Sequence, residues 1–514
     1  MANLAQLLGT RGPAAADVPM IDAAARDWDA DIRVTEALND GVASAWSRDY
    51  IENMPRRVAP RAALAVGTDL KQWNYRYMFE KKGERSLELD NRLDQMGEVI
   101  AHAFSLDELS DPSIPSQESV YTVGRICSRV DPGVAQSRLS PQTLMLESSR
   151  MVGNGQRVAL ALDPECRVRY AWSDESAGAS STVGLFPGMI VGLRGRNGSG
   201  GRFVADEILM PPALPHPATS RTELQEQYSA QDGVLRFAIA CGPFTAPTDL
   251  DFRPWHRLMD FVEHARPDVV VLLGPFLSES HPLIEKGDID ELPTDIFRRH
   301  ISQRLVKLVE SSPSTLPVLV PSTSDVFHAH HAYPQPFIDK SDPALGLPKR
   351  TRCLPNPCVF YINELAIGVS TADVLGDLQR EELVQRVAAA PDGTRRGADP
   401  MVRLARHVLG QRNFYPLFPP SATSGLPLDL SHSALCALQQ VTPDLLILPS
   451  RVRPFLRVVD SAVVVNPGQL ASENGDSFVR TQVEPFGSLD GEPEDLVVHE
   501  LYRRARVELV HTTT

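Results

Sequence analysis

The segment of residues 266–277, Arg-Pro-Asp-Val-Val-Val-Leu-Leu-Gly-Pro-Phe-Leu, limits the possible folds of this chain most strongly. Its five apolar residues, 269–273, lie between a charged proline turn and a Gly-Pro break. A short apolar run bounded in this way predicts a strand that is buried on both faces of an α/β domain. Ligands of open α/β sheets bind beyond the carboxyl ends of the strands, so any chemistry should follow residue 273. The side chains at that place cannot bind a metal or transfer a proton; they are Gly274, Pro275, Phe276 and Leu277.

The chain after residue 233 repeats this unit of a buried strand followed by a loop or helix. Further strands are predicted at 235–244, 316–325, 444–455 and 462–470, with edge strands within 492–510. Helices with one apolar face are predicted at 254–265, 294–309 and 401–412. A hairpin is predicted over 358–371, with its turn at Asn363-Glu364. This alternation predicts a layered α/β domain over residues 233–514.

Between residues 111 and 215 the pattern changes to short alternating segments joined by Gly- and Ser-rich turns. Five strands are predicted, at 121–130, 142–148, 156–163, 189–197 and 201–209. Five short strands in succession are typical of an OB-type β-barrel. Such barrels often bind single-stranded nucleic acid, and three arginines flank a hairpin of this one: Arg194, Arg196 and Arg202. Aromatic residues, on which nucleic-acid bases would stack, are nearly absent from the strands. We therefore expect that the barrel mainly packs against protein and that it contacts nucleic acid weakly at most.

The remaining segments are predicted to connect or flank these domains. Residues 1–72 show no sustained period and are expected to be a poorly patterned N-terminal region or linker. Residues 73–110 contain an amphipathic helix, which either packs on the next domain or binds a partner. Its apolar face consists of Leu89, Leu93, Met96 and Ile100. Residues 216–232 are polar, follow a proline-rich stretch and are expected to link the two domains.

Charge and cysteine content narrow the function classes. The net charge of −14 argues against broad, charge-driven wrapping of nucleic acid. Of the six cysteines only Cys353 and Cys358 are close together, which is a weak zinc signal, so we expect reduced thiols. No apolar run reaches the roughly 18–20 residues that cross a bilayer, and residues 1–19 make a poor signal peptide. A cytoplasmic or nuclear protein without membrane contact is predicted.

The predicted α/β domain resembles the calcineurin-like metallophosphoesterase fold. Enzymes of that fold bind two metal ions through His and carboxylate ligands at strand ends, with a bridging carboxylate. The four corresponding loops of this chain contain Asp325 as their one potential ligand. One carboxylate cannot hold two metal ions, so an inactive domain without metal or cofactor is expected. The degenerate positions are Gly242, Pro243, Phe244, Gly274, Pro275, Phe276, Ser322, Asp325, Ser450 and Arg451.

Histidines that follow Asp325 provide the enzymatic alternative. His328, His330 and His331 form the densest histidine cluster of the chain. A metallophosphoesterase with atypical ligands, using Asp325, His328 and His331, therefore stays open beside the inactive domain.

Longer motifs carry a more specific resemblance. They are ACGPFT (240–245), residues 266–277, VPSTSDVFH (320–328), YPQPF (333–337), PC (357–358) leading to IN (362–363), QRNFYPLFPP (411–420), TPDLLILPS (442–450) and VNPG (465–468). YMFE (77–80) and LFPG (185–188) extend them forward. Together they resemble the family of B subunits of the DNA polymerase alpha–primase complex, from about residue 73 to the end. The small subunits of polymerases delta and epsilon share the barrel and inactive phosphoesterase design, but YPQPF and FYPLFPP favour alpha.

This resemblance implies a non-catalytic scaffold subunit in the nucleus. Members of the family bind the zinc-bearing C-terminal domain of the polymerase catalytic subunit and thereby tether it to primase for replication initiation and lagging-strand priming. DNA contact would be weak or indirect. A strand-end region lined with Pro, Phe and Leu is expected to offer apolar contact surface. Residues 1–72 do not resemble the complete helical domain with which members usually begin. An active metallophosphoesterase and an independent single-strand-binding barrel remain as alternatives.

Overall fold

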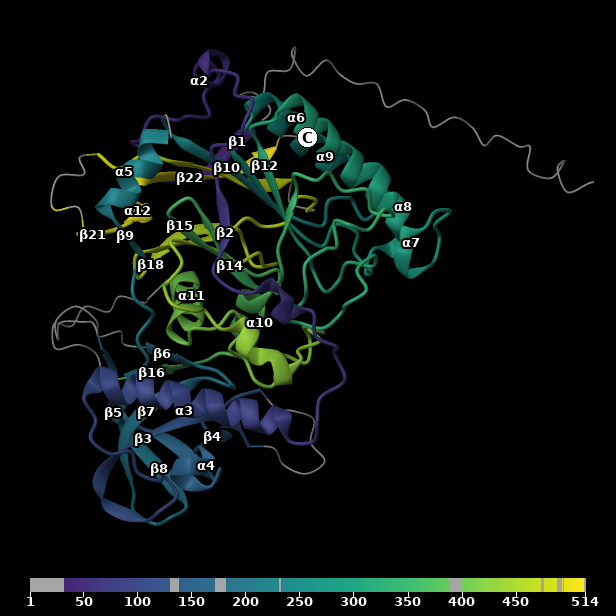
Figure 1. The fold of residues 1–514 in the computed structure, drawn as a ribbon. Helices are drawn as coiled ribbons and strands as arrows, with labels where there is room; N and C mark the ends of the chain where they lie inside the picture. The colour runs from purple at the N-terminus through teal and green to yellow at the C-terminus, as the bar shows by residue number, and fades with distance from the viewer. Residues whose placement is uncertain are drawn as a thin grey trace, which may run out of the picture.

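The computed structural model describes residues 32–129, 138–171, 182–230, 233–387, 399–472, 476–487, 492 and 494–512. A closed β-barrel and a larger domain with two main β-sheets make up this part of the chain. Figure 1 shows the barrel at the bottom of the view, with α3 (Glu84–Phe104) lying across it and the sheets above. Among the helices described, none is both long and apolar enough to cross a membrane.

Five strands close the barrel in the order β3-β4-β5-β8-β7, which confirms the five predicted strands. They are β3 (Ser116–Ser128), β4 (Leu144–Glu147), β5 (Arg157–Tyr170), β7 (Ile190–Asn197) and β8 (Arg202–Met210). Strands β5 and β8 run parallel and the other neighbours antiparallel. The short helix α4 (Arg150–Gly153) joins β4 to β5. Alternate apolar residues fill the interior, so the barrel is a packed core rather than an open channel.

Helix α3 confirms the predicted amphipathic helix and packs on the barrel. Its buried residues Leu93, Met96, Ile100 and Phe104 form one cluster with Val123, Ile190 and Leu209. A Cβ atom at Gly192 would lie 2.8 Å from Cγ2 of Ile100, so a glycine at this position lets the helix approach β7 closely. Of the two uses predicted for this helix, packing on the next domain is therefore the one that the structure shows.

The larger domain contains a seven-stranded and a six-stranded sheet. The first has the order β1 (Ile32–Leu38), β22 (Ala505–Thr512), β20 (Ser477–Val483), β10 (Leu235–Cys241), β11 (Val269–Leu273), β12 (Leu316–Val320) and β13 (Arg352–Cys353). The second has the order β18 (Phe455–Val459), β19 (Ala462–Asn466), β17 (Leu445–Ile447), β15 (Leu365–Val369), β14 (Cys358–Ile362) and β2 (Leu64–Val66). The predicted hairpin over 358–371 is the β14–β15 pair. Strand β11 is buried along its whole length, as its unbroken apolar run predicts.

Two apolar layers explain this burial. Val269, Val271 and Leu273 pack between the two sheets, whereas Val270 and Leu272 pack under the helices on the outer face. Those helices include α6 (Arg253–Ala265), α8 (Pro293–Phe297) and α9 (Gln303–Ser311). Helices α10 (Val374–Glu381) and α11 (Pro400–Gly410) cover the second sheet, and their core is continuous with that of the barrel.

The predicted helix over 294–309 is interrupted by a π-helical turn, Arg298–Ser302, between α8 and α9. The carbonyl of His300 accepts the indole N–H of Trp255 at 2.9 Å, and the Ser302 hydroxyl donates to the carbonyl of Leu345 at 2.6 Å. These contacts with distant segments accompany the wider turn, and spacing of apolar residues along the helix does not reveal them.

The expectation of a poorly patterned linker over 1–72 is wrong from Ile32 onwards. Strand β1 pairs with β22 and β2 pairs with β14, so this segment adds a strand to each sheet. A short helix, α2 (Arg48–Asn53), and a 3₁₀ turn, Leu70–Trp73, complete it. Buried Arg236 holds the segment by donating to the carbonyls of Ala45, Ala265 and Arg266. Edge strands with polar outer faces lack the apolar signal of central strands, which explains the wrong prediction.

The expectation of a linker over 216–232 is also wrong. Residues Ala218–Ser220 form β9, which pairs with β21 (Leu496–Val498), and Arg221–Ala230 form α5. The buried ring of His499 bridges the Thr219 hydroxyl and the Asp444 carboxylate, at 2.8 Å each. The predicted edge strands within 492–510 need a second correction, because β22 lies inside the sheet between β1 and β20. Helix α12 (Leu501–Arg504) separates β21 from β22.

Candidate functional site

The ends of β10, β11 and β12 meet because these neighbouring strands run parallel. The loops after them pack backbone against backbone. The thiol of Cys241 donates to the carbonyl of Gly274 at 3.3 Å. A Cβ atom at Gly242 would lie 1.9 Å from the carbonyl oxygen of Pro275. The structure therefore brings together the degenerate positions of the first two loops, but it leaves no space for a larger side chain at Gly242.

Phe244 and Phe276 turn into the protein from these loops. Their rings stack with centroids 5.3 Å apart, and neither residue has exposed surface. Both belong to the cluster that contains Trp255 and Phe297 beneath helices α6 and α8. The expectation that this region offers an apolar contact surface is wrong for these phenylalanines, because they satisfy the core of their own domain.

Asp325 joins the second loop to the third. One carboxylate oxygen, Oδ1, accepts the N–H groups of Phe276 at 2.5 Å and Leu277 at 3.1 Å, and the other accepts the N–H of Ser322 at 2.8 Å. The residue is fully buried, and this burial raises its pKa to about 7 although the three backbone hydrogen bonds act to lower it. Because backbone N–H groups donate to both carboxylate oxygens of Asp325, the role of this residue is structural.

Ser450 and Arg451, in the last loop, are organised by a carboxylate that the sequence reasoning missed. The Ser450 hydroxyl and the Arg451 N–H donate to Asp373, which also caps α10 through the N–H of Gly376. Asn466 accepts the N–H of Ser450 at 3.0 Å. Asp373 follows strand β15 by four residues, so searching the loop after that strand for carboxylates would have found it.

The histidine cluster does not combine with Asp325. The Nδ1 atom of His328 lies 3.1 Å from the carbonyl oxygen of His330, and Nδ1 of His331 lies 3.3 Å from that of Thr323. Burial lowers the pKa of His328, and it lowers that of His330 to about 4. Within the described ranges, no group of three His, Cys, Asp or Glu residues is placed to hold a metal ion.

Cys353 and Cys358, whose spacing gave the weak zinc signal, belong to strands of different sheets. Cys353 ends β13 and Cys358 begins β14, in different sheets, and both thiols are free. Burial raises the pKa of the Cys353 thiol to about 12 and also raises that of Cys358. Burial thus dominates at both thiols, even though Lys340 acts to lower the pKa of Cys353, and a raised pKa disfavours the thiolate that reactivity or metal binding requires.

The three barrel arginines are exposed, but acidic residues lie among them. Arg194 is opposite Glu207 in the β7–β8 register, and Glu207 also approaches Arg169, with 3.6 Å between nitrogen and oxygen. The N–H of Arg202 lies 3.4 Å from the side-chain oxygen of Asn197. Nucleic-acid contact by Arg194, Arg196 and Arg202 stays a prediction.

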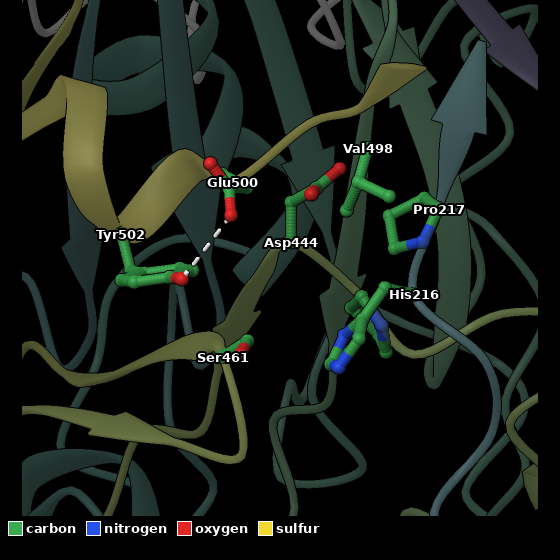
Figure 2. A pocket seen from close by; sticks show the side chains of 8 residues that line it. His216, Pro217, Asp444, Ser461, Val498, Glu500 and Tyr502 are labelled. Atoms are coloured by element: carbon green, nitrogen blue, oxygen red, sulfur yellow. Dashed lines mark hydrogen bonds between the residues drawn. The ribbon is translucent and has the colours of Figure 1, made fainter. Parts of the chain in front are cut away.

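A small pocket lies where the segment after the barrel meets β21. Figure 2 shows His216 and Pro217 facing Asp444, Ser461 and the Glu500–Tyr502 pair, whose oxygens are 3.4 Å apart. The cavity volume is about 70 Å³. Ligand pockets usually measure roughly 300–1,000 Å³, so this one is too small for a drug-sized molecule.

The barrel and the larger domain are joined by direct hydrogen bonds. The side chain of Gln411 pairs with both backbone groups of Ile190, and the Phe418 N–H donates to the carbonyl of Pro187 at 3.0 Å. Strand β6 (Thr182–Leu185) pairs with β16 (Leu383–Arg386) across the same junction. The motifs LFPG (185–188) and QRNFYPLFPP (411–420) are thus in contact with each other.

Two family models match these two parts of the chain. The model for the OB domain of the DNA polymerase alpha B subunit matches residues 86–170. The model for the B subunits of DNA polymerases alpha and epsilon matches residues 237–457. An OB barrel followed by this α/β domain places the chain in the class of B subunits of replicative DNA polymerases.

Similar curated proteins indicate which polymerase of this class is concerned. A Schizosaccharomyces pombe protein, named as the B subunit of DNA polymerase alpha, is 32% identical over 93% of this chain and 78% of its own length. The protein of that name from Saccharomyces cerevisiae is 30% identical over 86% of this chain and 66% of its own length. The one from Rattus norvegicus is 28% identical, and the match spans 79% of this chain and 62% of the relative. The chain belongs to the family of DNA polymerase alpha B subunits.

Proposed function

We propose that this chain is the non-catalytic scaffold subunit of a DNA polymerase alpha–primase complex in the nucleus. Its proposed partner is the zinc-bearing C-terminal domain of the polymerase catalytic subunit. By holding that domain it would tether polymerase to primase, so that primers are made and extended at replication initiation and on the lagging strand. Family membership supports the accessory role, and the names of the relatives favour alpha over the delta and epsilon alternatives.

One observation carries the non-catalytic part of the proposal. Asp325, the single carboxylate expected in the four loops, accepts three backbone N–H groups and is fully buried. The neighbouring Gly242 and Gly274 admit no side chain that could replace a lost ligand. We infer that the α/β domain derives from a calcineurin-like fold, in line with its parallel strands β10–β12 and its helices on both outer faces. Its degenerate positions now stabilise the loops.

The junction between the domains supports a scaffold that acts as one body. We propose that the barrel over 111–215, the helical segment 73–110 and the domain over 233–514, completed by β1 and β2, present a fixed relative arrangement to the partner. The apolar cluster that runs from the barrel to α10 and α11 supports this arrangement. Any DNA contact through Arg194, Arg196 and Arg202 would be weak beside protein contact.

A binding experiment tests the scaffold role. The full chain is immobilised and offered the purified C-terminal domain of a polymerase alpha catalytic subunit under reducing, zinc-replete conditions. We expect capture that is lost when zinc is removed from the partner beforehand. Absence of capture with the zinc-loaded domain would contradict the proposal.

A second measurement tests the enzymatic alternative directly. The full chain is incubated with Mn²⁺ and bis-p-nitrophenyl phosphate, beside its His328→Ala variant. We expect no turnover by either protein. Turnover by the parent chain that His328→Ala abolishes would support a metallophosphoesterase.

A further inference from the structure

The segment before helix α3 exposes large apolar side chains that the scaffold proposal does not use. Met78 is 85% exposed, Phe79 is 66% exposed and Leu87, in the first turns of α3, is 51% exposed. We call the region formed by Arg76, Met78, Phe79, Lys81, Lys82 and Leu87 the 76–87 surface. Exposed apolar residues that occur singly are common, but three within ten residues form a feature that a partner can use.

Two tyrosines fix this segment to the larger domain. The Tyr75 hydroxyl donates to the carbonyl of Pro334 at 2.6 Å, and its ring stacks on His432 with centroids 3.6 Å apart. The ring of Tyr77 meets the edge of His330 at 4.8 Å. Met78 follows these anchors in a turn, and its side chain is exposed. The exposed residues are therefore held on a fixed support, which lowers the entropy lost on binding.

The backbone at Met78 adds an independent observation. Its φ angle is 62°, in the left-handed region that a bulky residue other than glycine rarely adopts. The chain thus keeps an unfavourable backbone conformation and an exposed methionine at the same position. Backbone conformations of this kind concentrate at functional surfaces.

Three cations lie in the same segment as Met78 and Phe79. The Arg76 guanidinium lies 4.1 Å from the centroid of the Phe79 ring, and Lys81 and Lys82 are exposed. Over the described ranges, these three cations form no ion pair. Two carboxylates of the same segment are already engaged: Glu80 pairs with Arg85, and Glu84 accepts the N–H of Lys81. These exposed cations favour a partner that carries carboxylates.

We propose that the 76–87 surface is a docking site for an acidic peptide segment that carries apolar side chains. The apolar side chains of the partner would cover Met78 and Phe79, and its carboxylates would pair with Arg76, Lys81 and Lys82. Single-stranded nucleic acid fits less well, because the one exposed ring, Phe79, is already covered on one face by Arg76. This site goes beyond the scaffold role and does not depend on it.

The test measures peptide binding to the full chain by fluorescence anisotropy. The probe is a labelled peptide of about 15 residues in which Asp and Glu alternate with Leu and Phe. We expect saturable binding that Met78→Ser/Phe79→Ser weakens at least about tenfold, or about 1.4 kcal/mol. Lys81→Glu/Lys82→Glu should weaken it and reduce its dependence on salt.

Controls separate this site from general adhesion. Leu292→Ser removes an apolar residue of similar exposure, 67%, between α7 (Pro282–Glu285) and α8, and it should leave the affinity unchanged. Met78→Gly should raise the melting temperature by relieving the φ of 62° and should still weaken peptide binding. Equal affinity of the parent and Met78→Ser/Phe79→Ser proteins would overturn the proposal. So would tighter binding of a matched Lys-rich peptide or of an oligo-dT strand.

Discussion

The side-chain amide of Gln411 forms with Ile190 the two hydrogen bonds that a neighbouring strand residue would form. Its Nε2 donates to the carbonyl of Ile190 at 2.8 Å, and its Oε1 accepts the N–H of Ile190 at 2.9 Å. Both residues are buried, and they belong to different domains. A single side chain from the larger domain therefore completes the hydrogen bonding of barrel strand β7 at its first residue.

Gln411→Leu should weaken this junction. The substitution leaves the N–H and the carbonyl of Ile190 buried without partners, at a cost of roughly 1–3 kcal/mol each. We expect the free energy of unfolding in urea to fall by about 3 kcal/mol. Gln439→Leu, at an exposed position, is the matched control and should change little. Equal stability of the two variants would show that the amide pairing contributes nothing.

Gly274→Ala should disrupt the loops at the strand ends. A Cβ atom at this position would lie 2.4 Å from Oδ2 of Asp325 and 2.6 Å from the N atom of Ser322. Neither neighbour can move freely, so overpacking should lower the free energy of unfolding by about 3 kcal/mol. Gly41→Ala serves as control, because nothing lies within 4 Å of a Cβ there. Thermal unfolding of both variants measures the difference, and similar melting temperatures would contradict the steric argument.

The stability contribution of Asp325 should fall as the pH rises. Burial raises its pKa to about 7 in the folded chain, whereas the ordinary carboxyl pKa applies to the unfolded chain. Between about pH 4 and 7 the folded chain therefore retains a proton that the unfolded chain has lost, and stability decreases with rising pH. The slope from this group is at most about 1.4 kcal/mol per pH unit.

Asp325→Asn isolates this effect, since asparagine does not titrate. The stability difference between the parent chain and the variant, from urea unfolding at pH 5, 6 and 7, should shift steadily in favour of the variant. A difference that stays constant with pH would mean that Asp325 is ionised throughout this range in the folded chain.

Arg236→Met should loosen the N-terminal segment. It removes the donor to the carbonyls of Ala45, Ala265 and Arg266 and the cation that lies 5.1 Å from the ring of Trp46. Removing one partner of a buried charged network costs about 3–5 kcal/mol. We expect tryptic cleavage within residues 46–61 to become faster. Arg253→Met removes an exposed arginine and should leave the cleavage rate unchanged; equal rates for both variants would contradict the anchoring role.

Local pattern predicted the central elements well. The apolar run 269–273 coincides with β11, and the five barrel strands and the β14–β15 hairpin were found. Two barrel strands are longer than predicted, because β3 begins well before residue 121 and β5 extends well past residue 163. These elements are buried, so their sequences carry strong apolar signals. Strands β1, β2 and β9 were missed, because they are short or polar on an exposed side and pair with residues hundreds of positions away. The fully buried strand β20 was missed as well, because its sequence contains polar residues such as Arg480, which pairs with Glu508.

The sequence by itself determined that two neighbouring strand ends carry Gly-Pro-Phe, and it pointed to the family that the relatives establish. Only the tertiary structure decided where those phenylalanines point. Phe244 and Phe276 fill their own core, while Met78 and Phe79, in a segment the sequence left as the flank of a helix, are exposed. Burial depends on which distant segments cover a side chain. Composition and spacing do not record that relationship, because it arises only when the sheets, the helices and the N-terminal segment pack together.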